Sequence, residues 1–135
     1  MCLPPAMFRF AALPMKVSRK DETGDAFHPT LLAAFANAPS YGGGMKIAPW
    51  ARLDDGKLDI CLVREVNKFK AFCLFPTIYF GRHVKVAGVD SFQTDWIRLE
   101  TESPLALYAD GEYVCETPVE IGILPRALQV IVPSV

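Results

Sequence analysis

The stretch DWIRLETESPLALYADGEYVCETPVEIGILPRALQVIVP, residues 95–133, decides the fold that we expect for this chain. It consists of short runs rich in β-branched, aromatic and other apolar residues, separated by turn residues at intervals of about ten positions. Strands of this length and spacing are typical of β-sandwiches and barrels. We therefore expect a mainly β fold, an antiparallel β-sandwich. The expected strands are DWIRLETE, LALYA, EYVCE, VEIGIL and ALQVIVP.

Further strand-like runs precede this stretch. FRFAALPMKVSR, residues 8–19, suits one or two short strands because polar and apolar residues alternate along it. Periodicity alone allows TLLAAFANA, residues 30–38, to be strand or helix. A strand is favoured because Asn37, Pro39 and a run of glycines follow within a few residues.

KLDICLV, residues 57–63, shows the alternation of a strand with one buried face. Leu58, Ile60 and Leu62 would face the core. Lys57, Asp59 and Cys61 would face the other way. We expect this half-buried strand to leave an Asp-Gly turn directly before it.

One segment, VNKFKAFCLFPTIYF at residues 66–80, has the spacing of a helix instead. Its expected apolar face comprises Phe69, Phe72 and Cys73, with Val66 and Phe75 close to it. Pro76 should end or kink this helix, because proline has no backbone N–H to donate. The simplest picture is one short helix packed against a sandwich.

Length and composition place the chain among compact single domains. Its 135 residues are 51% hydrophobic and 21% charged, with a formal net charge of −1. This balance excludes a disordered chain and argues against a basic nucleic-acid binder. The four cysteines at positions 2, 61, 73 and 115 form no Cys-x-x-Cys pair, so we expect reduced, mostly buried thiols.

The sequence argues for a cytoplasmic location. No segment reaches the roughly 20 apolar residues of a membrane-spanning helix. The nearest, residues 71–80, is half as long and contains Pro76. The opening MCLPPAMFRFAALPM lacks the basic start of a signal peptide and is interrupted by prolines.

Two Asp-Gly pairs raise the question of chemistry, since both are expected to form two-residue hairpin turns. LDDGKLD, residues 53–59, offers three aspartates and exposed carbonyls, the oxygen ligands that Mg²⁺ prefers; a solvated turn is the alternative. In YADGEYV, residues 108–114, Glu112 follows the turn directly. A carboxylate held there would serve as a general base if its site were partly closed to water. The alternative is that this Asp-Gly pair forms only a structural turn.

Other motifs give weaker signals. The glycines of SYGGGMKIAP, residues 40–49, allow a tight path but match neither GxGxxG nor the Walker A pattern. His28 and His83 have no second metal ligand at suitable spacing and are expected to be ordinary surface or hydrogen-bonded histidines. No GxSxG motif supports acyl transfer.

KFKAFCLFPTIYFGRHVK, residues 68–85, surrounds an aromatic centre with basic residues. Such a segment could rest on an anionic membrane surface, with the aromatics at the acyl boundary. The alternative is a core helix with a solvated basic edge. The basic residues are Lys68, Lys70, Arg82 and Lys85.

Four segments, found at residues 35–63, 75–84, 108–114 and 123–133, carry a resemblance to a known family. In this order they resemble the C-terminal domain of the bacterial diacylglycerol kinase and YegS-like lipid kinase family, which includes the sphingosine kinases. The resemblance covers about residues 30–133. It implies a β-sandwich on the lipid side of a two-domain enzyme that transfers the γ-phosphoryl group of ATP to a lipid hydroxyl with Mg²⁺. The segments are FANAPSYGGGMKIAPWARLDDGKLDICLV, FPTIYFGRHV, YADGEYV and ILPRALQVIVP.

The resemblance also implies roles for individual residues. Glu112 matches the proposed general base of the family, on a turn set by Asp110 and Gly111. Asp55 matches the metal-binding aspartate. The carbonyls of Arg52 and Lys57 would be the flanking ligands of a mainly structural Mg²⁺.

The sequence departs from the family in one respect, because it contains no GGDGT nucleotide-binding motif. We expect residues 1–135 to be a single C-terminal domain that lacks the nucleotide-binding domain and is inactive without it. The expected partners are that domain or its separate chain, ATP bound through it, a lipid substrate, and the inner membrane surface by peripheral contact; no nucleic acid is expected. The lipid could be diacylglycerol, a sphingoid base or another lipid alcohol. A non-catalytic lipid- or membrane-binding module is the alternative function.

Overall fold

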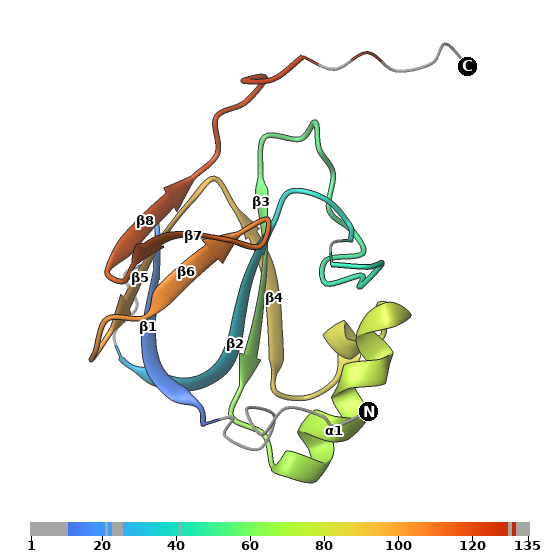
Figure 1. Cartoon of the computed structure of the whole chain (residues 1–135), viewed down its shortest axis with the longest axis vertical. Coiled ribbons are helices and arrows are strands. Elements are labelled where there is room, and N and C mark those ends of the chain that lie inside the picture. The colour runs from blue at the N-terminus through green and yellow to red at the C-terminus, as the bar shows by residue number, and fades with distance from the viewer. Residues whose placement is uncertain (1–10, 21, 23–25, 41, 130, 132–135) are drawn as a thin grey trace.

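The computed structural model describes residues 11–20, 22, 26–40, 42–129 and 131, and it is built on two antiparallel sheets (Figure 1). The larger has the strand order β4-β3-β2-β1-β5-β8, and the smaller pairs β6 with β7. The expected mainly β fold with one α-helix is confirmed. The strands of the larger sheet are β1 (Leu13–Arg19), β2 (His28–Ala36), β3 (Leu58–Arg64), β4 (Val89–Thr94), β5 (Trp96–Thr101) and β8 (Val119–Gly122). The other elements are β6 (Ala106–Ala109), β7 (Glu112–Glu116), the helix α1 (Lys68–Tyr79) and the 3-10 turn η2 (His83–Lys85).

Most of the expected strands form. The two upstream runs become β1 and β2, and residues 8–10 of the first run lie outside the described residues. Four of the five C-terminal runs become β5 to β8. The fifth is wrong where it is described, because residues 127–129 form no strand. Pro125 cannot donate to a ladder and Arg126 has a φ of 57°, so the chain leaves the sheet after β8. Residues 130, 132 and 133 of this run lie outside the described residues.

Strand β3 forms the centre of the domain and is buried on both faces. Leu58, Ile60 and Leu62 pack with Ile97 on one side. On the other side Cys61 packs with the segment 45–51 and with Ile78 of α1. The expectation of a half-buried strand is therefore wrong, because a helix and a loop cover the face that carries the more polar residues.

Burial has a chemical consequence for the thiol of Cys61. Its side chain is 1% exposed, and desolvation, reinforced by the charge of Asp90, raises its pKa to about 11. This thiol is protonated at neutral pH and belongs to the core. The expectation of mostly buried thiols is wrong for the described cysteines, because Cys73 on α1 is exposed and Cys115 on β7 is half-buried.

The helix α1 begins after Asn67, whose side chain accepts a hydrogen bond from the backbone N–H of Lys70 at 2.7 Å. Pro76 lies inside the helix, which continues to Tyr79 instead of ending at the proline. Among the side chains of α1 that the structure describes, those of Leu74 and Ile78 are buried.

The expected apolar face of α1 points the wrong way. Phe69, Phe72 and Cys73 are exposed, as is Phe75. The reason is that α1 is apolar around most of its circumference, so periodicity could not identify the packed face. Among the described residues, no helix is long and apolar enough to cross a membrane.

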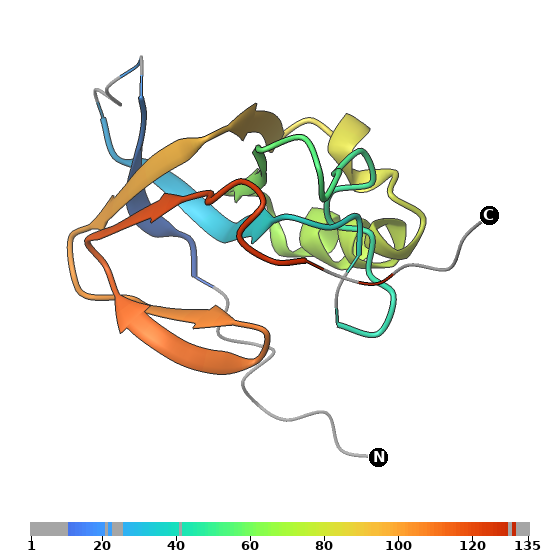
Figure 2. The same ribbon diagram turned by 90° about the horizontal axis from the view of Figure 1, so that it is seen from above.

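The β6–β7 hairpin stands apart from the six-stranded sheet, and in both views it lies well away from α1 (Figure 2). Most of its side chains are exposed. The two Asp-Gly turns therefore sit in different surroundings, one at the start of the buried β3 and one at the tip of this hairpin.

Candidate functional site

The first Asp-Gly pair, Asp55 and Gly56, is not a hairpin turn. It precedes β3, whose antiparallel partner β2 ends at Ala36, so residues 37–57 connect the two strands. A two-residue type I′ turn requires a positive φ at both central residues. Gly56 has a φ of 69°, but Asp55 is not among the residues with positive φ. The expectation failed because the dipeptide indicates a turn without indicating which strands it joins.

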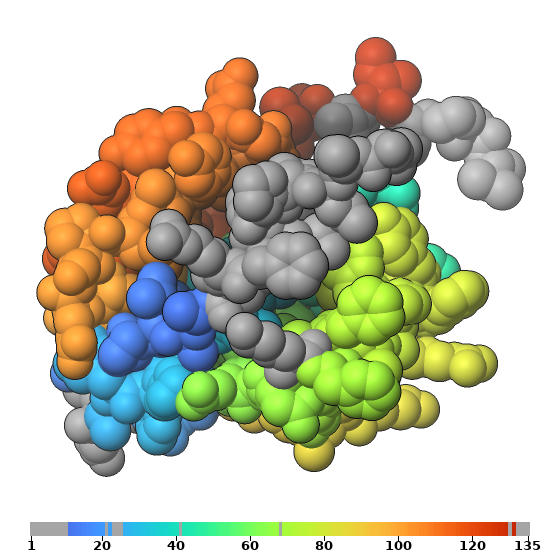
Figure 3. Space-filling view, turned by 60° about the horizontal axis from the view of Figure 1, so that its bottom comes forward, coloured from blue at the N-terminus to red at the C-terminus, as the bar shows by residue number. Residues whose placement is uncertain are grey.

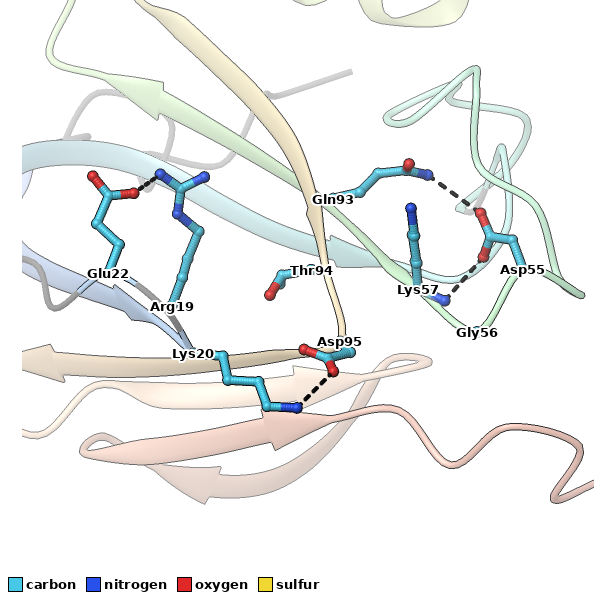
Figure 4. Close-up of a pocket in the computed structure, with 9 residues that line it drawn as sticks. All are labelled: Arg19, Lys20, Glu22, Asp55, Gly56, Lys57, Gln93, Thr94 and Asp95. Carbon is cyan, nitrogen blue, oxygen red and sulfur yellow. Dashed lines mark hydrogen bonds and ion pairs between the residues drawn. The ribbon is translucent and has the colours of Figure 1, made fainter.

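The carboxylate of Asp55 is held on both sides (Figure 4). One oxygen accepts the backbone N–H of Lys57 at 2.9 Å, which closes the turn locally. The other accepts Nε2 of Gln93, on β4, at 3.3 Å. The same nitrogen donates to Oδ1 of Asp59 at 2.8 Å. Gln93 therefore ties the turn to the first residues of β3.

Asp59 presents an unsatisfied oxygen beside this turn. Its side chain is fully buried, and its Oδ2 has no hydrogen-bond partner among the described residues. A buried carboxylate oxygen without a donor is costly, so a cation or a water molecule is the natural partner. Gln93 bridges this carboxylate to that of Asp55, which gives the region two hard oxygen donors.

These donors fit Mg²⁺ only if backbone carbonyls and water complete the coordination. Among the described residues, no group of three or more His, Cys, Asp or Glu side chains is arranged to hold a metal. The set that the family resemblance implies, the carboxylate of Asp55 with the carbonyls of Arg52 and Lys57, would be carbonyl-rich in this way. Arg52 itself is exposed, and its guanidinium pairs with Asp54 at 3.3 Å.

The Asp55 turn forms one wall of an open, polar pocket (Figure 4). Lys20 pairs with Asp95 at 3.1 Å, and Arg19 pairs with Glu22. The positive and negative charges that line this pocket are balanced, and they suit small hydrophilic groups better than an acyl chain. The lining residues are Arg19, Lys20, Glu22, Asp55, Gly56, Lys57, Gln93, Thr94 and Asp95.

The second Asp-Gly pair forms the hairpin turn that its sequence predicts. Ala109 pairs with Glu112, so Asp110 and Gly111 make a two-residue loop. Their φ values of 50° and 87° are both positive, as a type I′ turn requires. The turn places Glu112 at the first position of β7.

Glu112 is exposed, and its carboxylate makes no hydrogen bond or ion pair with any described residue. It is not one of the residues that line the pocket at Asp55. Tyr108 and Tyr113 stack edge to face with ring centroids 6.1 Å apart. Because successive side chains of a strand alternate, Tyr113 and Glu112 point to opposite faces of the hairpin. The condition for general-base chemistry, a site partly closed to water, is not met by the described residues alone.

His83 is a core residue. It is fully buried, and its Nε2 lies 3.0 Å from the carbonyl oxygen of Ile47, so Nε2 carries the hydrogen. Its Nδ1 has no partner among the described residues. Burial lowers the pKa of the imidazole, opposed by the bond to Ile47, and the ring is neutral at pH 7. His28, at the start of β2, is exposed.

Sequence reasoning found the two turns but missed the residues that support the first. Gln93, Arg19 and Lys20 lie far from Asp55 in sequence and belong to no motif. The alternation of β4, which places Gln93 and Ser91 on the same side, was the only available signal for Gln93.

Comparison with known proteins identifies the class. The family model described as "YegS C-terminal NAD kinase beta sandwich-like domain" matches residues 5–132. The chain belongs to this family, as its sequence led us to expect.

The relatives are lipid kinases by name. The chain is 39% identical over 113 residues to a diacylglycerol kinase of Mycobacterium tuberculosis, covering 84% of this chain and 36% of that one. It is 30% identical over 103 residues to a "probable lipid kinase YegS-like" of Shewanella frigidimarina, covering 76% and 33%. The chain thus spans about a third of the length of these relatives.

A solved structure supports the fold. The crystal structure of a diacylglycerol kinase from Bacillus anthracis matches with a TM-score of 0.64 and 20% identity. The match covers 89% of this chain and 42% of that one.

Proposed function

We propose that this domain supplies the lipid side of an ATP-dependent lipid kinase. The observation that carries the proposal is the Asp110–Gly111 turn, which holds the unpaired carboxylate of Glu112 in the open. The resemblance to the family assigns the general base to this position. Membership of the YegS family and the names of the relatives support the same reaction class.

In the proposed reaction, Glu112 accepts the proton of a lipid hydroxyl. The hydroxyl oxygen attacks the γ-phosphorus of ATP as the bond from that phosphorus to the bridging oxygen of ADP breaks. The products are a lipid phosphate, ADP and a proton held by Glu112. Phosphoryl transfer depends mainly on positioning and charge stabilisation, so we propose that a nucleotide-binding domain must face this hairpin and close it to water.

Asp55 and the carbonyls of Arg52 and Lys57 would hold Mg²⁺ in this proposal. The ion would neutralise the two carboxylates that Gln93 bridges and would fix the turn before β3. Its role is structural, since Asp55 and Glu112 share no contact and line no common pocket among the described residues.

The test uses a chimera in which this chain replaces the matching third of the M. tuberculosis diacylglycerol kinase. We expect the chimera to form phosphatidic acid from ATP and diacylglycerol, and the 135-residue chain alone to form none. Glu112→Gln in the chimera should lower kcat by about 10²–10⁴-fold, the usual contribution of general-base catalysis.

Glu116→Gln is the matched control, because Glu116 is also exposed, lies on the same face of β7 and makes no side-chain hydrogen bond or ion pair with any described residue. It should leave kcat within about twofold, since a solvated surface charge contributes little. A folded Glu112→Gln chimera with an unchanged rate would refute the role of Glu112. Phosphatidic acid formed by the chain alone would refute the need for a second domain.

A further inference from the structure

Four exposed aromatic residues of α1 and a fifth directly after it form a surface that we call the aromatic face of α1. Phe69 and Phe72 are 78% and 72% exposed, although they are large apolar side chains. The light-green side chains of α1 lie at the surface in the space-filling view (Figure 3). The face consists of Phe69, Phe72, Phe75, Tyr79 and Phe80.

The opposite side of the helix is already used by the fold. Leu74 and Ile78 are buried, and the carbonyl of Ile78 accepts the N–H of Lys46 at 3.1 Å. A helix that is apolar on both sides is expected between two apolar surroundings, and a contiguous exposed apolar patch marks an interaction site. The domain supplies only the inner surroundings among the described residues.

The segment that carries the aromatic face, residues 66–89, has charged side chains of a single sign. Residues 66–89 contain four of the 14 basic residues of the chain and none of its 15 acidic residues. Arg82 and Lys85 follow the helix directly, are exposed, and form no ion pair within the described part of the chain. Lys70 is held near the same segment, where its Nζ donates to the carbonyl of Ala87 at 2.6 Å.

We propose that the aromatic face of α1 binds the surface of an anionic lipid bilayer. The phenylalanines would enter the boundary between headgroups and acyl chains, and Arg82 and Lys85 would lie among the lipid phosphates. With 12 residues, α1 is suited to lie at the surface of a bilayer and too short to cross it. The proposal stands apart from phosphoryl transfer, because it needs neither ATP nor Glu112.

Charge argues against a second copy of the chain as the occupant. A symmetric dimer through this face would bring the basic residues of both copies together without an acidic partner from residues 66–89. Opposed like charges in a closing interface cost free energy. An anionic bilayer supplies the missing negative charge over the whole face.

The test is co-sedimentation of the 135-residue chain with vesicles. We expect binding to vesicles of phosphatidylcholine with about one-third phosphatidylglycerol, and much weaker binding to phosphatidylcholine alone or at high salt. The double variant Phe69→Ser/Phe72→Ser should weaken binding to the anionic vesicles by about 10–100-fold, because each phenylalanine loses roughly a tenfold contribution from apolar burial. Both side chains are exposed, so the variant should fold.

Two further variants separate apolar from electrostatic contributions. Arg82→Gln/Lys85→Gln should weaken binding to the anionic vesicles by about fivefold per residue and leave binding to phosphatidylcholine unchanged. Tyr108→Ser/Tyr113→Ser is the matched control, because these aromatics are 65% and 58% exposed but lie on the β6–β7 hairpin. It should not change vesicle binding.

Three results would overturn the proposal. The first is no binding of the wild-type chain to anionic vesicles, or equal binding of the Phe69/Phe72 variant. The second is self-association of the chain that the same variant abolishes, which would make the face a protein interface. The third is loss of vesicle binding in the kinase chimera, which would mean that the added domain covers the face. Loss of kinase activity in the chimera with vesicle binding retained would count only against the proposed catalytic function.

Discussion

The two Asp-Gly turns of this domain share a dipeptide and little else. At the first, both carboxylate oxygens of Asp55 accept hydrogen bonds, and the turn leads into the buried strand β3. At the second, Asp110 and Glu112 make no side-chain bond within the described residues, and the turn joins two largely exposed strands. One turn is held by side chains from elsewhere in the sheet, and the other only by its own backbone.

This difference separates the two proposed roles. A structural cation needs oxygens that are already in place, and the network of Asp55, Gln93 and Asp59 supplies them within this domain. A general base needs a surface that excludes water around it, and the hairpin of Glu112 has none among the described residues. The first proposed role would therefore need only residues of this domain, and the second would depend on what the hairpin faces.

The largest expected effect on stability comes from removing the bridge at the first turn. Gln93→Ala leaves Oδ1 of Asp59 without its donor and releases one side of Asp55. We expect the free energy of unfolding to fall by about 1–3 kcal/mol, the usual cost of an unsatisfied buried polar group. Urea unfolding measures the loss, and faster amide exchange at Lys57 would locate it at the turn.

The matched control is Ser91→Ala, two residues earlier on the same side of β4, because the side chain of Ser91 makes no hydrogen bond with any described residue. It should change the free energy of unfolding by less than about 0.5 kcal/mol. Equal effects of the two substitutions would show that Gln93 acts only through the strand propensity of β4. The contrast between a braced and an unbraced turn would then fail.

The sequence predicted the kinds of elements better than their surroundings. Alternation and turn spacing identified seven of the strands correctly, because these signals are local. The burial of Asp59 and Cys61 could not be predicted, since it depends on a helix and a loop that fold over β3 from other parts of the chain. The packed face of α1 was wrong for a related reason: Phe69 and Leu74 are both apolar, and only tertiary contacts choose between them.

The candidate site divides in the same way. The type I′ turn before Glu112 was predictable, because two-residue loops with positive φ at both positions favour Asp-Gly. The first turn was not, because its geometry depends on the long connection from β2 and on Gln93 of β4. The roles of Glu112, Asp55, Arg52 and Lys57 remain predictions from family resemblance.

A smaller effect should follow from strain at the second turn. Gly111 has a φ of 87°, and a Cβ placed there would meet no atom within 4 Å, so Gly111→Ala tests backbone conformation alone. We expect the hairpin to lose about 1–2 kcal/mol, the cost of a non-glycine residue in the left-handed region. The loss should appear as faster amide exchange in β7 and as a weaker near-ultraviolet signal from the Tyr108–Tyr113 pair.

Gly122→Ala is the control for this substitution, because Gly122 has no positive φ and its added Cβ would make only ordinary contacts of 3.7–3.8 Å. It should leave β7 unaffected and change overall stability by less than about 1 kcal/mol. Slower exchange at Lys57 than at Tyr113 in the wild type would agree with the contrast between the turns. An unchanged hairpin in Gly111→Ala would show that contacts beyond its backbone hold the second turn.

The smallest expected effect is a pH dependence of the free energy of unfolding that acts through the loop of the first turn. The first turn belongs to the loop of residues 37–57, and this loop is held where Nε2–H of His83 donates to the carbonyl of Ile47. Burial lowers the pKa of His83 in the folded state. The unfolded chain therefore takes up a proton near its ordinary pKa of about 6.5 before the folded chain does. Stability is complete above that pH and is lost below it, by at most about 0.7 kcal/mol between pH 7 and pH 6. Urea unfolding of the His83→Gln variant should not show this loss. The exposed His28 is present in both proteins, so any contribution it makes cancels in the comparison. If the protection factor of the Tyr113 amide against hydrogen exchange falls between pH 7 and pH 6 as much as that of the Lys57 amide, His83 does not act through the loop of the first turn.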